Sequence, residues 1–216
     1  MAYKVIIFDL DGTLLDTLDD LGQAVNHALA KHGFPLHGRD GYRRMVGHGI
    51  RNLVTTALPV ELQGDEGLID ECLADFKKYY TSHIDVHTRP YDGMPELLQD
   101  LRDQGVALAV ASNKFQAGTE TLIREFFPGI PFVSILGNRE GAPLKPDPEI
   151  VQEVLRKAGQ AAETTVLVGD SPTDMKTAQN GGIRGIAVQW GYRDMTDGST
   201  YPLAANPAEL KALLLG

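Results

Sequence analysis

The sequence has a single cysteine, no apolar run of membrane-spanning length and no concentration of positive charge. With Cys72 alone, no disulfide can form within the 216-residue chain, and its apolar neighbours at helical spacing place it in a core. A membrane-spanning helix needs about 20 apolar residues, and Asp9 and Asp11 interrupt the apolar start of the chain before it reaches signal-peptide length. These absences argue against a disulfide-stapled secreted domain and predict a cytoplasmic protein without a membrane partner.

The lysines and arginines form no cluster along the sequence, and neither do the histidines. The chain has 20 Lys and Arg against 29 Asp and Glu, its formal net charge is −9, and its basic residues form no long run. A nucleic-acid binder usually presents a basic face, so we expect no nucleic-acid partner. The six histidines show no pairing at the spacing of metal ligands, which argues against a zinc site.

Polar side chains instead follow the ends of predicted strands. Residues 4–8 form a β-branched and aromatic run typical of a strand buried on both faces, and Asp9 and Asp11 follow it directly. Two acids at the end of a buried strand are costly unless a cation compensates their charge. An ordinary Asp-Gly turn is the alternative interpretation of this segment.

Two further apolar strands end in the same way. Residues 106–111 are followed by Ser112-Asn113-Lys114, and residues 165–168 are followed by a segment that contains Asp170 and Asp174. Lys145 stands between them, just before a helical pattern over 149–158. Because the carboxyl ends of parallel strands meet at one edge of a sheet, these side chains are expected to gather there.

The periodicity predicts an α/β fold with an inserted helical segment. Helical patterns begin at Leu18 and continue over 48–58 and 68–83, after which strands and helices alternate from Tyr91 to the last helix at 207–215. Such alternation indicates a parallel sheet with helices on both faces. The length allows one sizeable core and a small extra domain.

The set of motifs, in this order, resembles the haloacid dehalogenase superfamily of phosphohydrolases, whose four motifs are all present between Asp9 and Asp174. The resemblance implies a Rossmann-like catalytic core over 1–15 and 88–216. It also implies an α-helical cap over 16–87, inserted after the first strand. Within the superfamily the chain resembles the phosphoglycolate phosphatases, in two segments described below.

The resemblance also implies roles for individual residues. Asp9 would be the nucleophile that forms an aspartyl-phosphate, and Asp11 would be the general acid and base. Lys145 would place a positive charge beside the phosphoryl group during its transfer. Mg²⁺ would be held by the carboxylates of Asp9 and Asp170 and the main-chain carbonyl of Asp11. The phosphoryl oxygens would be bound by Ser112, Asn113 and Lys145. Thr13 and Asp174 would orient the groups that contact the metal ion or the substrate, without contacting the substrate themselves.

The presence of an acid at Asp11 distinguishes the phosphatases of the superfamily from its dehalogenases. The family's dehalogenases lack an acid at this position, because a halide needs no proton on leaving. The order Asp-Leu-Asp-Gly-Thr therefore points to phosphate esters or anhydrides. A small phosphorylated metabolite is the expected partner. The sequence does not fix the oligomeric state, so a monomer and a weak dimer both stay open.

A glycine-rich segment with three arginines, residues 43–51, stands out in the predicted cap. It is similar to a Val-Gly-x-Gly segment of phosphoglycolate phosphatases, and an arginine there would suit the second carboxylate of phosphoglycolate. The candidate substrate-binding residues are Arg43, Gly47, His48 and Arg51. The alternative is a glycine turn between two helices with solvated arginines.

Phosphoglycolate phosphatase is the preferred interpretation, and others stay open. Leu144 precedes Lys145 where phosphoglycolate phosphatases often have a second lysine. An inorganic pyrophosphatase, a sugar-phosphate phosphatase or a mutase like β-phosphoglucomutase would share the same core residues. A phosphate-binding or regulatory protein on this scaffold is disfavoured because no catalytic position is missing. The segment Trp190-Gly191-Tyr192-Arg193 resembles a loop near the active site of phosphoglycolate phosphatases, or it covers the edge of the sheet.

Overall fold

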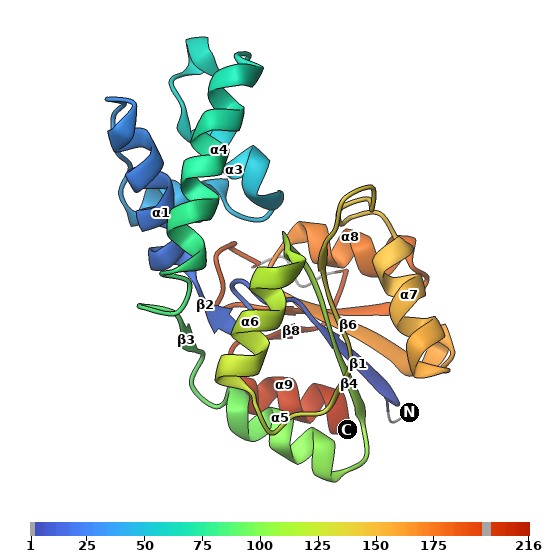
Figure 1. Cartoon of the computed structure of the whole chain (residues 1–216). Helices are drawn as coiled ribbons and strands as arrows, with labels where there is room; N and C mark the ends of the chain where they lie inside the picture. The colour runs from blue at the N-terminus through green and yellow to red at the C-terminus, as the bar shows by residue number, and fades with distance from the viewer. Residues whose placement is uncertain (1–2, 196–199) are drawn as a thin grey trace. The chain divides into compact units, whose positions relative to one another are not determined.

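The computed structural model describes residues 3–195 and 200–216 (Figure 1). The chain forms two compact units. One contains the chain up to Asp16 together with Pro90–Gly216, and the other is Thr17–Arg89. The chain passes between them at two short strands, β2 (Leu15–Asp16) and β3 (Arg89–Pro90), which pair with each other.

The first unit is built on a parallel sheet. Within the described residues the sheet has six strands in the order β5 (Phe132–Asn138), β4 (Ala107–Phe115), β1 (Val5–Phe8), β6 (Thr165–Gly169), β7 (Arg184–Val188) and β8 (Leu203–Ala204). All neighbouring strands run parallel, as the sequence predicts. All four residues of β1 are buried, which explains its continuous apolar sequence.

The register of the central strand fixes where the site can form. Phe8 at the end of β1 pairs with Val110 of β4 on one side and with Val168 of β6 on the other. The segments that follow these three strands therefore meet at one edge of the sheet. This is the point where the order of the strands reverses, and in open α/β sheets it is the usual place for a ligand.

Helices cover the sheet on both faces (Figure 1). They are α5 (Met94–Asp103), α6 (Gln116–Phe126), α7 (Glu149–Ala158), α8 (Pro172–Asn180) and α9 (Pro207–Leu215), with a short 3-10 helix, η2 (Ala162–Thr164). α7 and α8 pack their apolar residues against the face that carries Val5 and Ile7. α5 and α9 lie together on the other face (Figure 1).

Strand β4 is longer than the sequence predicts. The apolar run predicts an end at Ala111, but the strand continues to Phe115 with an irregular register against β5. Gly137 of β5 makes this possible, because a Cβ atom there would lie 2.6 Å from the carbonyl oxygen of Lys114. Ser112, Asn113 and Lys114 are consequently strand residues rather than loop residues.

The second unit is a small helical bundle of α1 (Leu18–Lys31), α2 (Arg39–Met45), α3 (Gly49–Ala57) and α4 (Glu66–Thr81), with a short 3-10 helix, η1 (Val60–Leu62). Its core contains the buried rings of Tyr42, Phe76 and Tyr80. Gly22 of α1 admits the ring of Tyr42, since a Cβ atom there would lie 2.6 Å from that ring. The short helix α2 is absent from the sequence-based prediction. No helix in the described part of the chain is long and apolar enough to cross a membrane.

A buried carboxylate joins the beginning and the end of the helical unit. Asp20, in the first turn of α1, is 2% exposed. Its Oδ2 atom accepts hydrogen bonds from the amide of His87 at 2.9 Å and the amide of Thr88 at 2.8 Å, and the Thr88 hydroxyl lies 2.8 Å away. This one side chain therefore satisfies the backbone donors of the segment that leaves the unit.

Removing this carboxylate is expected to loosen the helical unit. Asp20→Ala leaves buried donors without an acceptor, so the free energy of unfolding should fall by about 1.5 to 3 kcal/mol. Urea denaturation measures the loss, and hydrogen–deuterium exchange should locate it in Thr17–Arg89. The matched control is Asp19→Ala in the same helical turn, where the 49%-exposed side chain pairs with Arg39. That change should cost less than about 1 kcal/mol. Equal losses in the two variants would contradict this account of Asp20.

Candidate active site

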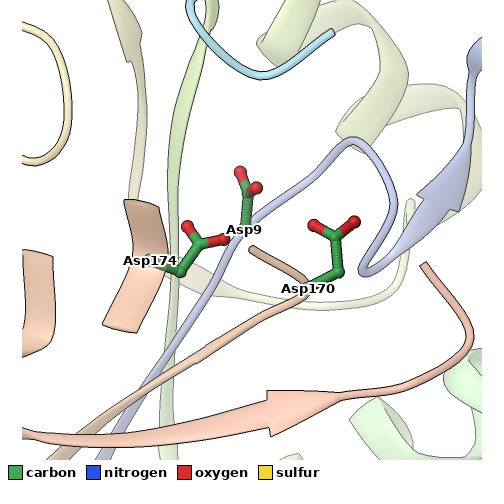
Figure 2. Close-up of side chains that lie close together, drawn as sticks. All are labelled: Asp9, Asp170 and Asp174. Atoms are coloured by element: carbon green, nitrogen blue, oxygen red, sulfur yellow. The ribbon is translucent and has the colours of Figure 1, made fainter. Parts of the chain in front are cut away.

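Three carboxylates lie together at the carboxyl edge of the sheet (Figure 2). Asp9 follows β1, Asp170 follows β6, and Asp174 stands in the first turn of α8. One oxygen atom from each lies within 4.8 Å of the others. Asp170 and Asp174 are 3% and 0% exposed, so water contributes little to neutralising this group.

Lys145 supplies a positive charge to two of the three carboxylates. Its ammonium lies 2.9 Å from Oδ1 of Asp9 and 2.6 Å from Oδ1 of Asp174. The ammonium also donates to the carbonyl of Ala111 at 2.9 Å. Burial by itself would lower the pKa of Lys145, but the two carboxylates outweigh it and raise that pKa above its usual range. Lys145 is therefore a fixed cation in the site.

The side chain of Asn113 holds the main chain of Lys145. Its amide oxygen accepts from the Lys145 amide at 2.8 Å, and its amide nitrogen donates to the Lys145 carbonyl at 3.1 Å. The side chain of Asn113 therefore positions the main chain of the lysine, and the phosphate-binding role that the sequence indicates for Asn113 stays a prediction. This pairing joins residues 32 positions apart, and local sequence carries no signal for it.

Asp174 is held by the start of its own helix. Its Oδ2 accepts from the Ser171 amide at 3.1 Å and from the Ser171 hydroxyl at 2.5 Å, which forms a capping box. Gly169 leaves room for it, because a Cβ atom at Gly169 would lie 2.3 Å from the Asp174 carboxyl carbon. The other oxygen of Asp174 is thereby directed to Lys145.

The segment after β7 holds Asp170. The amide of Tyr192 donates to Oδ2 of Asp170 at 2.6 Å, and the indole of Trp190 donates to the carbonyl of Thr13 at 3.1 Å. Gly191 lies between them, and a Cβ atom there would be 2.2 Å from Cβ of Asp170. The Thr13 hydroxyl also lies 3.5 Å from Oδ1 of Asp170. Of the two interpretations of residues 190–193, the structure supports the one near the carboxylates.

Asp11 and Lys114 form a second ion pair at the same edge. The ammonium of Lys114 lies 3.2 Å from Oδ1 of Asp11, with side chains 1% and 14% exposed. The hydroxyl of Ser112 accepts from the Lys114 amide at 3.2 Å, so its own hydrogen can be donated elsewhere. The motifs described above indicate no role for Lys114. Its position directly after Ser112-Asn113 is the signal that could have indicated one.

The charge of this cluster suits a divalent cation. Three ionised carboxylates around one ammonium carry an excess of two negative charges. Burial, with mutual repulsion, raises the pKa of Asp9 to about 8 and that of Asp170 to about 7. A cation would favour the ionised forms, and carboxylate oxygens are the hard ligands that magnesium prefers. The residues present therefore fit a divalent metal ion.

The remaining predicted site residues belong to the helical unit. Gly47 has a φ of 123° and Gly49 a φ of 81°, which only glycine adopts readily, and His48 between them is exposed. Arg43 is exposed on α2. The guanidinium of Arg51 pairs with Asp70 at 2.5 Å and with Glu66. Two carboxylates of α4 thus already engage Arg51.

Comparison with known proteins identifies the family. The sequence matches the haloacid dehalogenase-like hydrolases over residues 6–188. A phosphoglycolate phosphatase of Mesorhizobium japonicum is 38% identical over 195 residues, which cover 90% of this chain and 86% of that protein. A phosphoglycolate phosphatase of Pseudomonas syringae pv. syringae is 35% identical over 192 residues, which cover 88% of this chain and 70% of that protein.

Solved structures agree with this result. A candidate phosphoglycolate phosphatase from Lactobacillus delbrueckii subsp. bulgaricus is 31% identical and matches over 100% of both chains with a TM-score of 0.92. CbbY from Rhodobacter sphaeroides, solved in complex with phosphate, shares the fold over 96% of each chain with a TM-score of 0.77 and 24% identity. The resemblance that the strand-end motifs indicate is therefore confirmed: the chain belongs to the haloacid dehalogenase-like hydrolases and is a phosphatase.

Proposed function

We propose that this phosphatase is a magnesium-dependent phosphoglycolate phosphatase that works through an aspartyl-phosphate on Asp9. The observation that carries the proposal is the buried Asp9–Lys145 pair beside Asp170, at the edge where the central strands end. The relatives named phosphoglycolate phosphatase at 31% to 38% identity support the choice of substrate.

In the first step a carboxylate oxygen of Asp9 attacks phosphorus. A bond forms between that oxygen and phosphorus, and the bond from phosphorus to the glycolate oxygen breaks. Asp11 gives its proton to the departing oxygen, so glycolate leaves as an alcohol. Lys145 and the Ser112 hydroxyl hold the phosphoryl oxygens during transfer.

In the second step water attacks the phosphorus of the aspartyl-phosphate. Asp11, now ionised, removes a proton from that water, and the bond between phosphorus and the Asp9 oxygen breaks. Inorganic phosphate leaves and both aspartates return to their starting states.

Asp9, Asp170 and the main-chain carbonyl of Asp11 would hold Mg²⁺. When bound, Mg²⁺ would offset the negative charge shared by the Asp9 carboxylate and the substrate phosphate. Asp174 and Thr13 would act through their neighbours, because Asp174 orients Lys145 and Thr13 lies against Asp170.

The helical unit would serve as the cap predicted over 16–87. It is inserted as one piece between β2 and β3, so the chain leaves and re-enters the catalytic unit at paired strands. Such an insert can close over substrate and exclude bulk water from the phosphoryl group.

Arg43 is the arginine that we propose for the carboxylate of phosphoglycolate. It precedes the Gly47-His48-Gly49 turn, whose glycine backbone permits a close approach to substrate. Arg51 is the second candidate, and binding substrate would require it to give up Asp70 or Glu66. Main-chain groups of Gly47 and the ring of His48 would complete the contact.

The covalent mechanism predicts that Asp9→Asn is inactive. An amide is not a nucleophile toward phosphorus, so turnover of p-nitrophenyl phosphate should fall by roughly 10⁴-fold or more with the fold intact. Acid quenching of the wild-type enzyme during turnover should trap phosphate on a peptide that contains Asp9. EDTA should abolish wild-type activity and Mg²⁺ should restore it.

The matched control is Asp103→Asn, an exposed carboxylate on α5, which should behave as wild type. Near-wild-type turnover by an Asp9→Asn preparation shown to be free of deamidation would exclude the covalent mechanism. Activity that survives EDTA would exclude the role of the metal.

The substrate assignment predicts a selective defect in Arg43→Ala. A charged hydrogen bond contributes about 1.5 to 3 kcal/mol, so kcat/KM for phosphoglycolate should fall roughly 10- to 150-fold. The value for p-nitrophenyl phosphate should stay nearly constant, because its leaving group carries no carboxylate. Arg124→Ala, on the exposed surface of α6, is the control.

An equal loss on both substrates would assign Arg43 to folding or closure rather than recognition. A wild-type preference for pyrophosphate or a sugar phosphate in the same assay would overturn phosphoglycolate while leaving the phosphatase mechanism in place.

A further inference from the structure

The pair between Lys114 and Asp11 has no role in the steps above. The Lys114 side chain is 1% exposed, and its ammonium lies 3.2 Å from Oδ1 of Asp11. A buried ammonium is costly unless it is paired and hydrogen-bonded. The acid that it contacts is the one that must meet the leaving group.

The backbone of Lys114 is fixed on several sides. Its amide donates to the Ser112 hydroxyl at 3.2 Å, and its carbonyl accepts from the Thr119 hydroxyl at 3.3 Å. The missing side chain of Gly137 lets β5 approach that carbonyl. Lys114 therefore projects from a rigid strand rather than from a loop.

Asp11 lies in a turn that is well defined in its backbone. The Gly12 amide donates to the Leu15 carbonyl at 2.8 Å, and Asp11 itself forms a bridge with Leu15. These contacts fix the main chain of Asp11, whereas its carboxylate still has to be set in one rotamer. The ammonium of Lys114 donates to Oδ1 of Asp11, an atom that accepts a hydrogen bond whether the carboxyl group is ionised or carries its proton on Oδ2.

The two buried lysines of the site thus contact different acids. Lys145 contacts Asp9 and Asp174, whereas Lys114 contacts Asp11. We propose that Lys114 is a positioning residue, which holds the carboxylate of Asp11 in the orientation that serves the leaving oxygen. This inference rests on the proposed function, because it presumes that Asp11 is the general acid.

The leaving group provides the test. Glycolate must be protonated as it departs, whereas p-nitrophenolate is stable enough to leave without a proton. kcat/KM reports the steps up to phosphoryl transfer, so it isolates the first use of Asp11. Lys114→Met should lower kcat/KM for phosphoglycolate by roughly 10- to 100-fold, the usual cost of a misplaced catalytic group. For p-nitrophenyl phosphate the change should be less than about threefold.

A double-mutant cycle separates positioning from other roles. If Lys114 acts through Asp11, adding Lys114→Met to Asp11→Asn should cause almost no further loss on phosphoglycolate. The control is Lys211→Met, which removes an exposed lysine paired with Asp100 and should leave both substrates unaffected. If Lys114→Met does not fold, Lys114→Gln enters the same cycle.

Equal losses on both substrates, or an additive loss in the Asp11→Asn background, would overturn the proposal and assign Lys114 to phosphate binding or folding. No loss on either substrate would also overturn it. Failure of the proposed function has different signatures, and neither depends on the Lys114 variants. An active Asp9→Asn variant would exclude the covalent mechanism, and a wild-type preference for another substrate would overturn the choice of phosphoglycolate.

Discussion

The structure of the site depends on the repulsion among three buried carboxylates. Asp9, Asp170 and Asp174 each place an oxygen atom within 4.8 Å of the others, and Asp170 and Asp174 are almost fully buried. Lys145 faces two of them, and the Tyr192 amide serves Asp170. The negative charge that the three carboxylates carry when ionised suits the site to a metal ion, which would in turn offset the charge of a phosphate ester.

Such a cluster requires backbone segments to approach side chains more closely than a Cβ atom allows. Gly12, Gly169 and Gly191 each stand where an added Cβ would lie 2.2 to 2.4 Å from Asp170 or Asp174. The glycines that follow β1, end β6 and follow β7 are therefore packing requirements of the carboxylates. Electrostatics and sterics act on the same few residues, and for that reason the motifs are compact in the sequence.

Elements with a strong local pattern could be predicted from the sequence, whereas contacts between distant segments could not. Helices α7 and α9 match their predicted spans. α7 has an apolar stripe and the C-cap residue Gly159, and α9 begins after the cap residue Asn206 with Pro207 in its first turn. The extension of β4 depends on Gly137, and the pairing of Lys114 with Asp11 joins residues 103 positions apart. Neither leaves a periodic signal near Lys114, and the same holds for the pairing of the Asn113 side chain with Lys145.

The two compact units differ in what their sequences indicate: one indicates the reaction and the other the substrate. The groups that match the chemistry of phosphoryl transfer all come from the sheet unit, where strand ends and tight turns leave recognisable motifs. The arginines that could recognise a substrate lie in the helical unit, on helix surfaces that tolerate many side chains without loss of folding. The residues that carry out the reaction are thus strongly constrained by packing and charge, whereas those that could bind the rest of the substrate are weakly constrained. The sequence consequently indicates the class of reaction more sharply than the molecule on which it acts.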